Sequence, residues 1–378
     1  MADARLFAVR RPGESDPRRE RVRRWLAEHP APTGAQLLDA GYLVPHWPAP
    51  WGRAAAGEDL QIISDELRRA SVPLPSLPLA RGYIGPLVLR TGTDWQRDRY
   101  LRKLLTGEET WCQLFSEPEA GSDLAALSTR ARRDGEEYVV NGTKIWTTHA
   151  HLAQFGLLLA RTDPAAAQHR GISCFICPMD AAGLTLTPIY DMAGEYKWNL
   201  TQLDGVRLGP GHLIGAENEG WHIARAVLAN ERMSMSSDIG LAWGQGPVYL
   251  DLLAAARQRG AVGPLATELR GRVARGYCRE LALHVMRTQA LGQVSHESRG
   301  GVIPEVRRTL SDQHGQQMLE LWRELHGPAG VAARPGGGAA SGAFADYYFF
   351  ARALTIGGGT AEIQRNVLAE RTLGLPRG

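Results

Sequence analysis

Hydrophobic positions follow a helical spacing in the first hundred residues of the chain. Apolar side chains recur every three or four residues there, in segments separated by proline and glycine, which is typical of amphipathic helices. Pro30, Gly41 and Gly107 stand where such helices would end. We therefore expect helices at Arg18–His29, Thr33–Ala40, Asp59–Arg69 and Asp94–Leu105, and an irregular surface segment at Val44–Trp51.

From Trp111 to about Gly215 the period shortens to two, which indicates β-strands. The dipeptide Asn141-Gly142 lies between two strand-like runs and predicts a hairpin turn. Helical spacing returns at Gly220. We expect strands within Tyr138–Trp146, Phe155–Arg161, Ile172–Ile176 and Leu184–Ile189, then helices at Trp221–Ile239, Pro247–Arg259, Pro264–Leu291, Ile303–His326, Phe344–Leu354 and Ala361–Leu373, with a flexible loop at Ala332–Gly342.

This order of elements predicts an α+β fold in three parts. We expect an N-terminal helical domain (residues 1–110), a central β-barrel or β-sandwich domain (111–217) and a C-terminal helical bundle (218–378). The chain has 378 residues, of which 44% are hydrophobic, so it can bury cores of this size without a stabilising metal or disulfide.

Charge and hydropathy exclude several classes of protein. The net charge is +3, and the arginines between Arg18 and Arg24 alternate with Glu14, Asp16 and Glu20, which is typical of a solvated helix face rather than a nucleic-acid contact. No stretch approaches the roughly 18 apolar residues that a membrane span needs. The N-terminus lacks the apolar run of a signal peptide, so we expect a cytoplasmic protein.

The four cysteines do not predict a metal site. Cys174 and Cys177 form a CxxC pair, but no second pair and no histidine with finger-like spacing accompanies it. The surrounding residues indicate a buried strand in a reducing compartment. We expect no metal ion.

Three segments carry candidate chemistry. In Trp111–Asp123, Pro118 and Gly121 shape a loop whose serine hydroxyls and amides could contact a phosphate or a ring. In Asn141–Thr148, a tryptophan precedes two threonines, which offers the flat surface and the hydroxyl donors that a flavin needs. In Ile356–Asn366, three glycines precede a helix with Thr360 as its expected N-cap. Alone, this last segment is as typical of a glycine-rich helix start as of a pyrophosphate contact.

Together these segments resemble the acyl-CoA dehydrogenase family, in order and spacing and over nearly the whole chain. The resemblance implies FAD as cofactor and an acyl-CoA substrate. It also implies roles for individual residues: Gln113, Leu114, Phe115, Ser116 and Ser122 in the flavin-binding loop, Trp146, Thr147 and Thr148 in a second flavin strand, Thr360 and Glu362 at FAD near a subunit interface, and Ser122 and Arg232 at the acyl-CoA.

The resemblance implies an alternative position for the catalytic base. Desaturation needs a carboxylate to accept the α-proton of the thioester. Many family members place this glutamate just before the Gly-Thr of the closing motif, where this chain has Gly358. Isovaleryl-type members place it before an arginine on the helix after the β domain, where this chain has Glu231-Arg232. We expect Glu231 to be the base, against the alternative of a helix glutamate that pairs with arginine, and keep Glu195 in reserve.

Other segments depart from the family pattern. In the family, one segment reaches the FAD of the neighbouring subunit. The corresponding region here lacks the aromatic residue of that segment, which leaves Arg257 or Arg259 as the candidate FAD contact. Shortened segments of this kind resemble actinobacterial members, including enzymes of fatty acid or steroid side-chain metabolism and heteromers.

The expected function is α,β-desaturation of an acyl-CoA or related thioester, with the β-hydride passing to flavin N5. We expect an electron-transfer flavoprotein as acceptor and a homo-oligomer (dimer or homotetramer), with a heteromer as an alternative. The alternatives in function are an oxidase, a monooxygenase or a desulfinase of the same fold, or an inert partner subunit of a heteromeric dehydrogenase.

Overall fold

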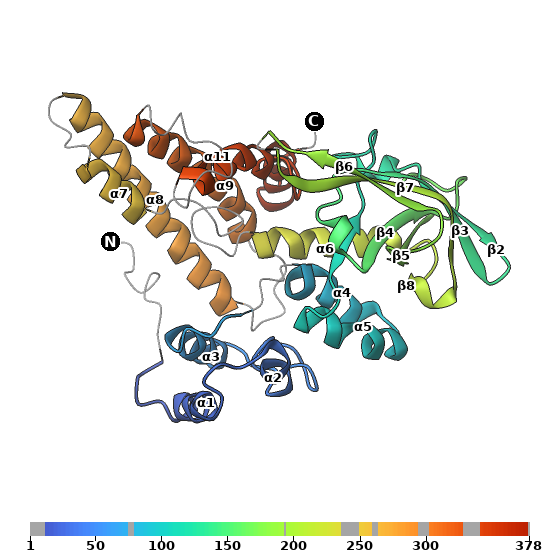
Figure 1. The fold of residues 1–378 in the computed structure, drawn as a ribbon, viewed down its shortest axis with the longest axis horizontal. Helices are drawn as coiled ribbons and strands as arrows, with labels where there is room; N and C mark the ends of the chain where they lie inside the picture. Colours follow the sequence, from blue (N-terminus) through green and yellow to red (C-terminus); the bar gives the residue numbers. More distant parts are fainter. Residues whose placement is uncertain are drawn as a thin grey trace. The chain divides into compact units, whose positions relative to one another are not determined.

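The computed structural model describes residues 12–74, 79–192, 194–235, 249–258, 264–293, 302–327 and 341–376 (Figure 1). These residues form two compact units. The N-terminal unit contains the described residues 12–190 and 196–231, and the C-terminal unit contains 191–195 and the residues from 232 onward. The helix–sheet–helix order confirms the predicted α+β class.

The N-terminal unit begins with short helices whose ends carry local signals. Thr33 and Thr93 each form a capping box with a glutamine three residues later, and Gly107 ends its helix with φ of 83°. The four expected helices are confirmed as α1 (Pro17–Glu28), α2 (Gly34–Asp39), α3 (Glu58–Arg69) and α5 (Asp94–Thr106). Two further elements were not predicted, the π-helical η2 (Leu79–Ile84) and the helix α4 (Gly85–Thr91).

Within the described residues, eight strands form one sheet in the order β6-β7-β3-β2-β4-β5-β8, with β1 added in parallel to β4. On β4, Leu157 and Leu159 face the core shared with the helices, while Leu158 and Ala160 face a second core. Both faces of the central strands are therefore buried. The strands are β1 (Trp111–Leu114), β2 (Arg130–Asp134), β3 (Glu137–Lys144), β4 (Phe155–Arg161), β5 (Ile172–Pro178), β6 (Leu184–Tyr190), β7 (Tyr196–Leu208) and β8 (Leu213–Ile214).

The hairpin predicted at Asn141-Gly142 is wrong. Strand β3 runs through both residues, and its pairing with β7 shifts register between Val140 and Gly142, which marks a bulge. A Cβ on Gly142 would lie 2.3 Å from Thr129 Oγ1, so glycine is required for close approach of β2 and β3 rather than for a turn. The actual hairpin turn of β2 and β3 lies at Gly135, whose φ is 65°.

The segment Val44–Trp51 also differs from its prediction in one respect. It lacks regular structure, as expected, but Val44 and Trp47 are buried in the helical core rather than on the surface. A Cβ on Gly52 would lie 2.3 Å from the Val44 carbonyl oxygen, so this loop folds tightly on itself.

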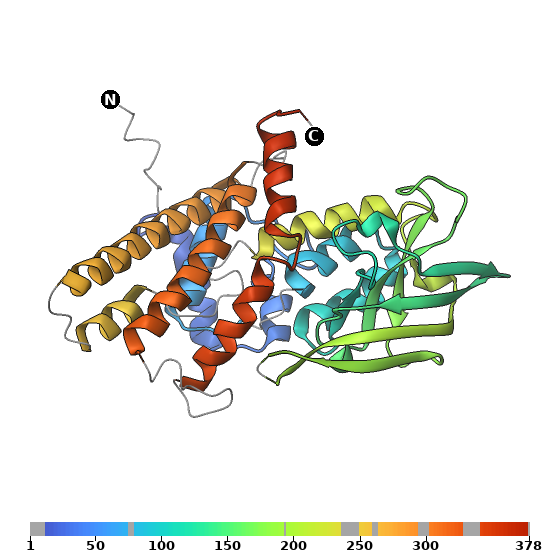
Figure 2. The ribbon, with the colours of Figure 1, turned by 90° about the horizontal axis from the view of Figure 1, so that it is seen from above.

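The C-terminal unit is helical. Helices α7, α8, α9 and α11 lie side by side (Figure 2), and buried leucine and methionine side chains from α7, α8 and α9 form a core of their own. The expected helices are confirmed: α7 (Tyr249–Gln258), α8 (Pro264–Gln293), α9 (Val302–His326), α11 (Ser341–Leu354) and α12 (Ala361–Val367), which continues into the π-helical η6 (Leu368–Thr372).

Helix α6 (Gly220–Met235) crosses the division between the units. The predicted range of this helix extends to Ile239, and the part after Met235 lies outside the described residues. Most of the predicted loop Ala332–Gly342 also lies outside them, and the last two residues of that loop begin α11. In the described part of the chain, none of the helices combines the length and apolar character that a membrane crossing requires.

Candidate flavin and acyl-thioester site

The first predicted flavin segment leaves β1 as a tight loop. Leu114 and Phe115 are buried, so only their main-chain atoms are available to a ligand, whereas Gln113 and Ser116 are partly exposed. Two main-chain hydrogen bonds of 3.0 and 3.1 Å close a turn between Glu117 and Ala120. The loop thus presents main-chain groups at its base and polar side chains beyond the turn.

Beyond this turn, Gly121 and Ser122 are exposed. A Cβ placed on Gly121 would meet no atom within 4 Å. The glycine is therefore not needed for packing inside the chain, which leaves room at this point for an external group to approach the backbone.

A buried ion pair that was not predicted from the sequence lies beneath this loop. Lys144 Nζ donates to Glu117 Oε1 at 2.8 Å and to the Phe115 carbonyl at 3.0 Å. Burial alone would raise the pKa of Glu117, but the Lys144 charge and hydrogen bonds from Ser128 and Thr129 lower it to about 2. Burial lowers the pKa of Lys144 to about 8, against the opposing effect of the Glu117 charge. Both groups are therefore ionised at neutral pH.

In the second predicted flavin segment, Trp146, Thr147 and Thr148 differ in how far their side chains are buried. Thr147 is fully buried, and its hydroxyl donates to the Asn199 carbonyl at 2.8 Å and contacts Thr201 Oγ1 at 2.9 Å. Trp146 is 57% exposed and Thr148 is half-buried. Trp146 and Thr148 can therefore present an indole face and a hydroxyl outward, while the buried Thr147 anchors the segment.

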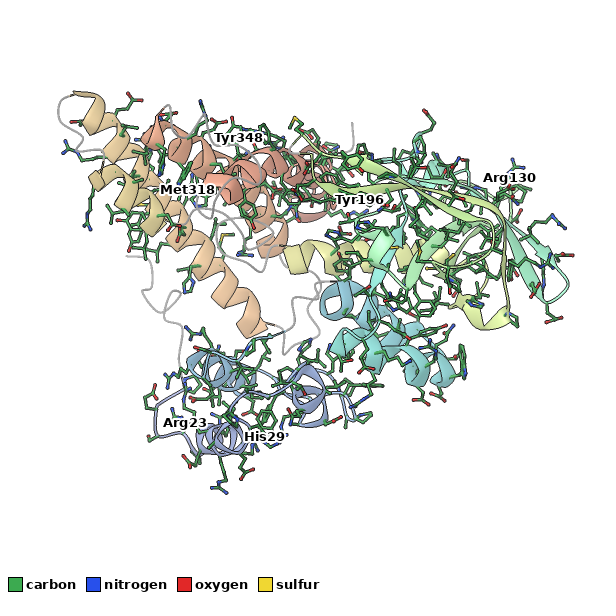
Figure 3. The ribbon with its side chains drawn as sticks, in the orientation of Figure 1. Arg23, His29, Arg130, Tyr196, Met318 and Tyr348 are labelled. Carbon is green, nitrogen blue, oxygen red and sulfur yellow. The ribbon has the colours of Figure 1, made fainter. Side chains whose placement is uncertain are left out.

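Trp146 has a left-handed backbone, with φ of 59°, which is unfavourable for an aromatic residue. The surrounding contacts hold it in place. Asn199 Nδ2 donates to the Thr147 carbonyl at 3.0 Å, Tyr196 Oη donates to Asn199 Oδ1, and His151 stacks on Tyr196 with ring centroids 3.9 Å apart. Tyr196, labelled in Figure 3, begins β7. Sequence reasoning missed this network because its members lie up to 52 residues apart.

Glu231 belongs to the same unit as both segments. It lies on α6 and is only 8% exposed, near the buried Val227 and Ala224 of the helical core. Its charge acts on Tyr83 of η2, a residue that sequence reasoning missed. Burial, and then the Glu231 charge, raise the pKa of the Tyr83 phenol well above its usual range, so the phenol stays protonated and can act as a donor. The side chain of Arg232 lies outside the described residues.

The third segment lies in the C-terminal unit. Thr360 is the N-cap of α12, as predicted, and its hydroxyl accepts a hydrogen bond from the Ile363 amide at 3.2 Å. Gly358 and Gly359 have φ of 69° and 95°, so the loop depends on glycine. Glu362 is exposed on the first turn and pairs with Arg365 at 3.3 Å.

The remaining candidates have less favourable surroundings. Glu195 is exposed in the loop between β6 and β7, where its amide donates to the Asp191 carboxylate at 2.8 Å. Arg257 is exposed on the last turn of α7, and Arg259 lies outside the described residues. Neither Glu195 nor Arg257 has the buried surroundings of Glu231.

The CxxC pair lies in β5, as predicted. Cys174 packs in the core shared with the helices and Cys177 in the second core, because residues three apart on a strand face opposite sides. The two thiols therefore cannot ligate the same ion. Within the described ranges, no cluster of three or more His, Cys, Asp or Glu is arranged to hold a metal.

These groups fit a flavin cofactor. An exposed indole held in an unfavourable backbone, a half-buried threonine hydroxyl and an open glycine loop with main-chain donors are the chemistry that an isoalloxazine ring and its phosphates require.

Comparison with known proteins gives matches along the whole chain. Residues 9–108, 112–205 and 218–373 match the N-terminal, middle and C-terminal domains of acyl-CoA dehydrogenases. The chain is 36% identical over 345 residues to acyl-CoA dehydrogenase FadE34 of Mycobacterium tuberculosis, covering 90% of this chain and 46% of that protein. It is 34% identical over 358 residues to acyl-CoA dehydrogenase IpdE1 of the same organism, covering 90% of this chain and 87% of that protein.

Two solved structures are similar over nearly their full lengths. The Tcur3481-Tcur3483 steroid ACAD superposes with a TM-score of 0.78 at 28% identity, covering 98% of this chain and 100% of that one. The ChsE4-ChsE5 complex from Mycobacterium tuberculosis superposes with a TM-score of 0.74 at 27% identity, with the same coverage. The fold and the site define an FAD-dependent dehydrogenase. The chain belongs to the acyl-CoA dehydrogenase family.

Proposed function

We propose that this chain forms an α,β double bond in an acyl thioester such as an acyl-CoA, with Glu231 as the base that accepts the α-proton. The observation that carries the proposal is the buried position of Glu231, whose charge acts on the buried Tyr83. The family resemblance implies a carboxylate at the position that Gly358 occupies in this chain, and because glycine has no side chain we propose that another group accepts the proton. The spans 1–110, 111–217 and 218–378 are proposed as the three domains.

FAD would be held by two segments of the N-terminal unit. Trp146 and Thr148 offer a flat surface and a hydroxyl at the ring, and the main chain of Leu114 and Phe115 supplies contacts that need no side chain. The other proposed contacts are Gln113, Ser116, Ser122 and Thr147, with Thr360 and Glu362 from the C-terminal unit. The chemistry supplied by bound FAD is acceptance of the hydride that leaves the β-carbon.

The residues of the chain carry the proton side of the reaction. The carboxylate of Glu231 takes the α-proton as the α-C–H bond breaks. The electron pair of that bond forms the new double bond as the hydride leaves the β-carbon. Burial limits the access of water to the carboxylate, and we propose that the phenol of Tyr83, which burial and the Glu231 charge keep protonated, acts as a donor toward it. We propose that Ser122 and Arg232 contact the acyl-CoA.

The substrate is proposed to be a bulky acyl chain of the steroid side-chain type rather than a simple fatty acid. One similar solved structure is named a steroid ACAD. The chain shares 28% of its residues with that structure over almost its whole length, whereas several other similar structures reach only 18–22% identity.

Assembly and location are also proposals. Leu250, Tyr277, Leu281 and Ile356 are large apolar side chains exposed on the C-terminal unit, which favours a homo-oligomer such as a dimer or homotetramer. An electron-transfer flavoprotein is the proposed acceptor. The four cysteines are free thiols, which favours a reducing compartment such as the cytoplasm.

The test is anaerobic bleaching of the bound flavin by a panel of acyl-CoAs with straight, branched and steroid chains. We expect a steroid-type thioester to bleach the parent fastest, and Glu231→Gln to slow bleaching by ~10²–10⁴-fold while FAD stays bound. Glu195→Gln, which removes an exposed glutamate, is the matched control and should bleach at the parental rate. Parental bleaching by Glu231→Gln would overturn the assignment of the base.

A second candidate is a partner subunit of a heteromeric dehydrogenase. Two similar solved structures are named as pairs of different chains, Tcur3481-Tcur3483 and ChsE4-ChsE5. A chain that binds FAD only when produced with a second family member, and that bleaches only in that complex, would support this candidate. A protein purified alone with FAD and bleached by an acyl-CoA would exclude it.

A further inference from the structure

We propose that the Glu117–Lys144 ion pair is the positioning device of the flavin site, because it fixes the main chain of the flavin loop against the strand that leads into Trp146. The inference rests on the proposed flavin roles of the two segments and adds two residues to them. Neither residue is proposed to touch substrate. They act through the backbone that they hold.

The contacts run from the centre of the pair to the main chain on both sides. Lys144 Nζ donates to Glu117 Oε1 at 2.8 Å and to the Phe115 carbonyl at 3.0 Å. The next residue of the strand, Ile145, donates its amide to the Ser116 carbonyl at 2.9 Å. Two consecutive carbonyls of the loop are therefore held by two consecutive residues just before Trp146.

Glu117 connects the loop to a further part of the sheet. Its Oε2 accepts hydrogen bonds from the amide and the hydroxyl of Ser128, each at 2.7 Å, and its Oε1 accepts one from the Thr129 amide at 2.9 Å. Both carboxylate oxygens are thus satisfied within the chain. The pair therefore joins the loop, the start of β2 and the end of β3.

The choice of buried charges is informative. A buried ion pair contributes little stability relative to well-packed apolar residues, because desolvation offsets the attraction. An aliphatic pair could fill this space, but it could not donate a hydrogen bond to the Phe115 carbonyl or accept one from a main-chain amide. Lys144 is fully buried and Glu117 is 5% exposed. The two charges therefore orient main-chain groups inside the protein and do not contribute to its solubility.

The same unit contains an ion pair that serves as a natural comparison. Arg19 and Glu66 are 1% and 4% exposed, and Arg19 Nη1 lies 2.6 Å from Glu66 Oε1. This pair joins α1 to α3, and a second arginine, Arg23, contacts the same carboxylate at 2.8 Å. Its contacts involve neither predicted flavin segment, so it measures what the loss of a buried carboxylate costs without a positioning role.

The experiment compares Glu117→Gln with Glu66→Gln. Both variants remove a buried negative charge and keep the shape of the side chain. Apo-protein is titrated with FAD without any acyl thioester, and the dissociation constant, the visible flavin spectrum and the thermal midpoint of the apo-protein are recorded. We expect Glu117→Gln to weaken FAD binding by about 10- to 100-fold and to change the flavin spectrum, since charge-assisted hydrogen bonds at the loop are lost.

Glu66→Gln should lower the thermal midpoint but leave FAD affinity and spectrum at parental values. The inference is overturned if Glu117→Gln binds FAD like the parent, or if both variants lose affinity in proportion to their stability. Should Glu117→Gln not fold, Glu117→Asp, which keeps the charge on a shorter side chain, is expected to bind FAD more weakly than the parent, and parental affinity in that variant would overturn the inference. Because no acyl thioester is present, a wrong base assignment leaves this result untouched, whereas a parent that bound no FAD would overturn the proposed function itself.

Discussion

Arg308 of α9 holds the glycine-rich loop through the carbonyl of Gly357, to which its Nη2 donates at 2.8 Å. The same guanidinium donates from Nε to Asp312 Oδ2 at 2.8 Å, and both side chains are almost completely buried. Burial raises the pKa of Asp312 to about 6, and the Arg308 charge opposes this rise. The loop before Thr360 therefore depends on a buried charge from a helix that precedes it by about fifty residues.

Replacement of Arg308 by Met should destabilise the C-terminal unit strongly. The variant leaves Asp312 buried without its cation, and loss of one partner of a buried ion pair typically costs about 3–5 kcal/mol. Arg365→Met, which removes the arginine of the exposed Glu362 pair, should change stability by less than about 0.5 kcal/mol. Urea unfolding followed by circular dichroism measures both, and equal midpoints for the two variants would contradict the prediction.

Tyr83→Phe should change the pH dependence of the reaction rather than only its rate. The phenol is kept protonated and lies in the field of Glu231. Without this dipole the ionised carboxylate is less favourable, so the base becomes protonated at a higher pH. The acid limb of bleaching rate against pH should therefore move to higher pH by up to about one unit. The control is Tyr100→Phe, which changes a buried tyrosine beside Trp111 and Phe155. Superimposable pH profiles of the parent and both variants would count against an effect of Tyr83 on Glu231.

Asn199→Ala should loosen the segment that carries Trp146. The variant removes the donor to the Thr147 carbonyl and the acceptor for Tyr196, which leaves buried polar groups unsatisfied at a cost of about 1–3 kcal/mol. We expect a lower thermal midpoint together with weaker FAD binding. Asn141→Ala removes an exposed side chain that accepts a hydrogen bond from the Gly205 amide, and this variant should keep parental FAD affinity. Retention of parental FAD affinity by Asn199→Ala would contradict the role of this network.

Acid should destabilise the N-terminal unit through Glu117. Its pKa is lowered from 4.5 to about 2 in the folded chain. Between these values the unfolded chain binds a proton that the folded chain does not, so stability is full above about pH 4.5 and falls as pH decreases toward 2. The difference of about 2.5 units corresponds to roughly 3 kcal/mol. Urea midpoints between pH 7 and pH 3 should fall less steeply in Glu117→Gln, and equal slopes in the two proteins would refute the linkage.

The sequence predicts elements well where their signals are local. The helix ending at Gly107 has its stop residue in the left-handed conformation, and the strands β4 and β5 consist mainly of apolar residues. The hairpin at Asn141-Gly142 failed because the same dipeptide also suits a bulge, and only the close approach of Thr129 decides between them. The helix α4 and the π-helical turn before it were missed because Gly82, Gly85 and Pro86 read as loop residues.

The candidate site shows the same limit. Motif resemblance predicts Trp146, Thr147 and Thr148 alike as flavin contacts, and it could not show that the hydroxyl of Thr147 points into the sheet toward Asn199. Glu117 and Lys144 lie inside the two predicted flavin segments, yet their pairing across 27 residues follows from strand register, which no short stretch of sequence contains. Tyr83 lies far from Glu231 in sequence and belongs to no motif, so the sequence did not indicate that the two residues interact.

The burial of three thiols determines how the protein can be labelled. Cys112, Cys174 and Cys177 are buried, and burial raises the pKa of each, so they remain unreactive protonated thiols. Cys278 on α8 is exposed. A maleimide dye added to the native protein should therefore attach at this one position without any engineered cysteine. The fluorescence intensity and anisotropy of such a dye would report the association of the C-terminal unit with other chains.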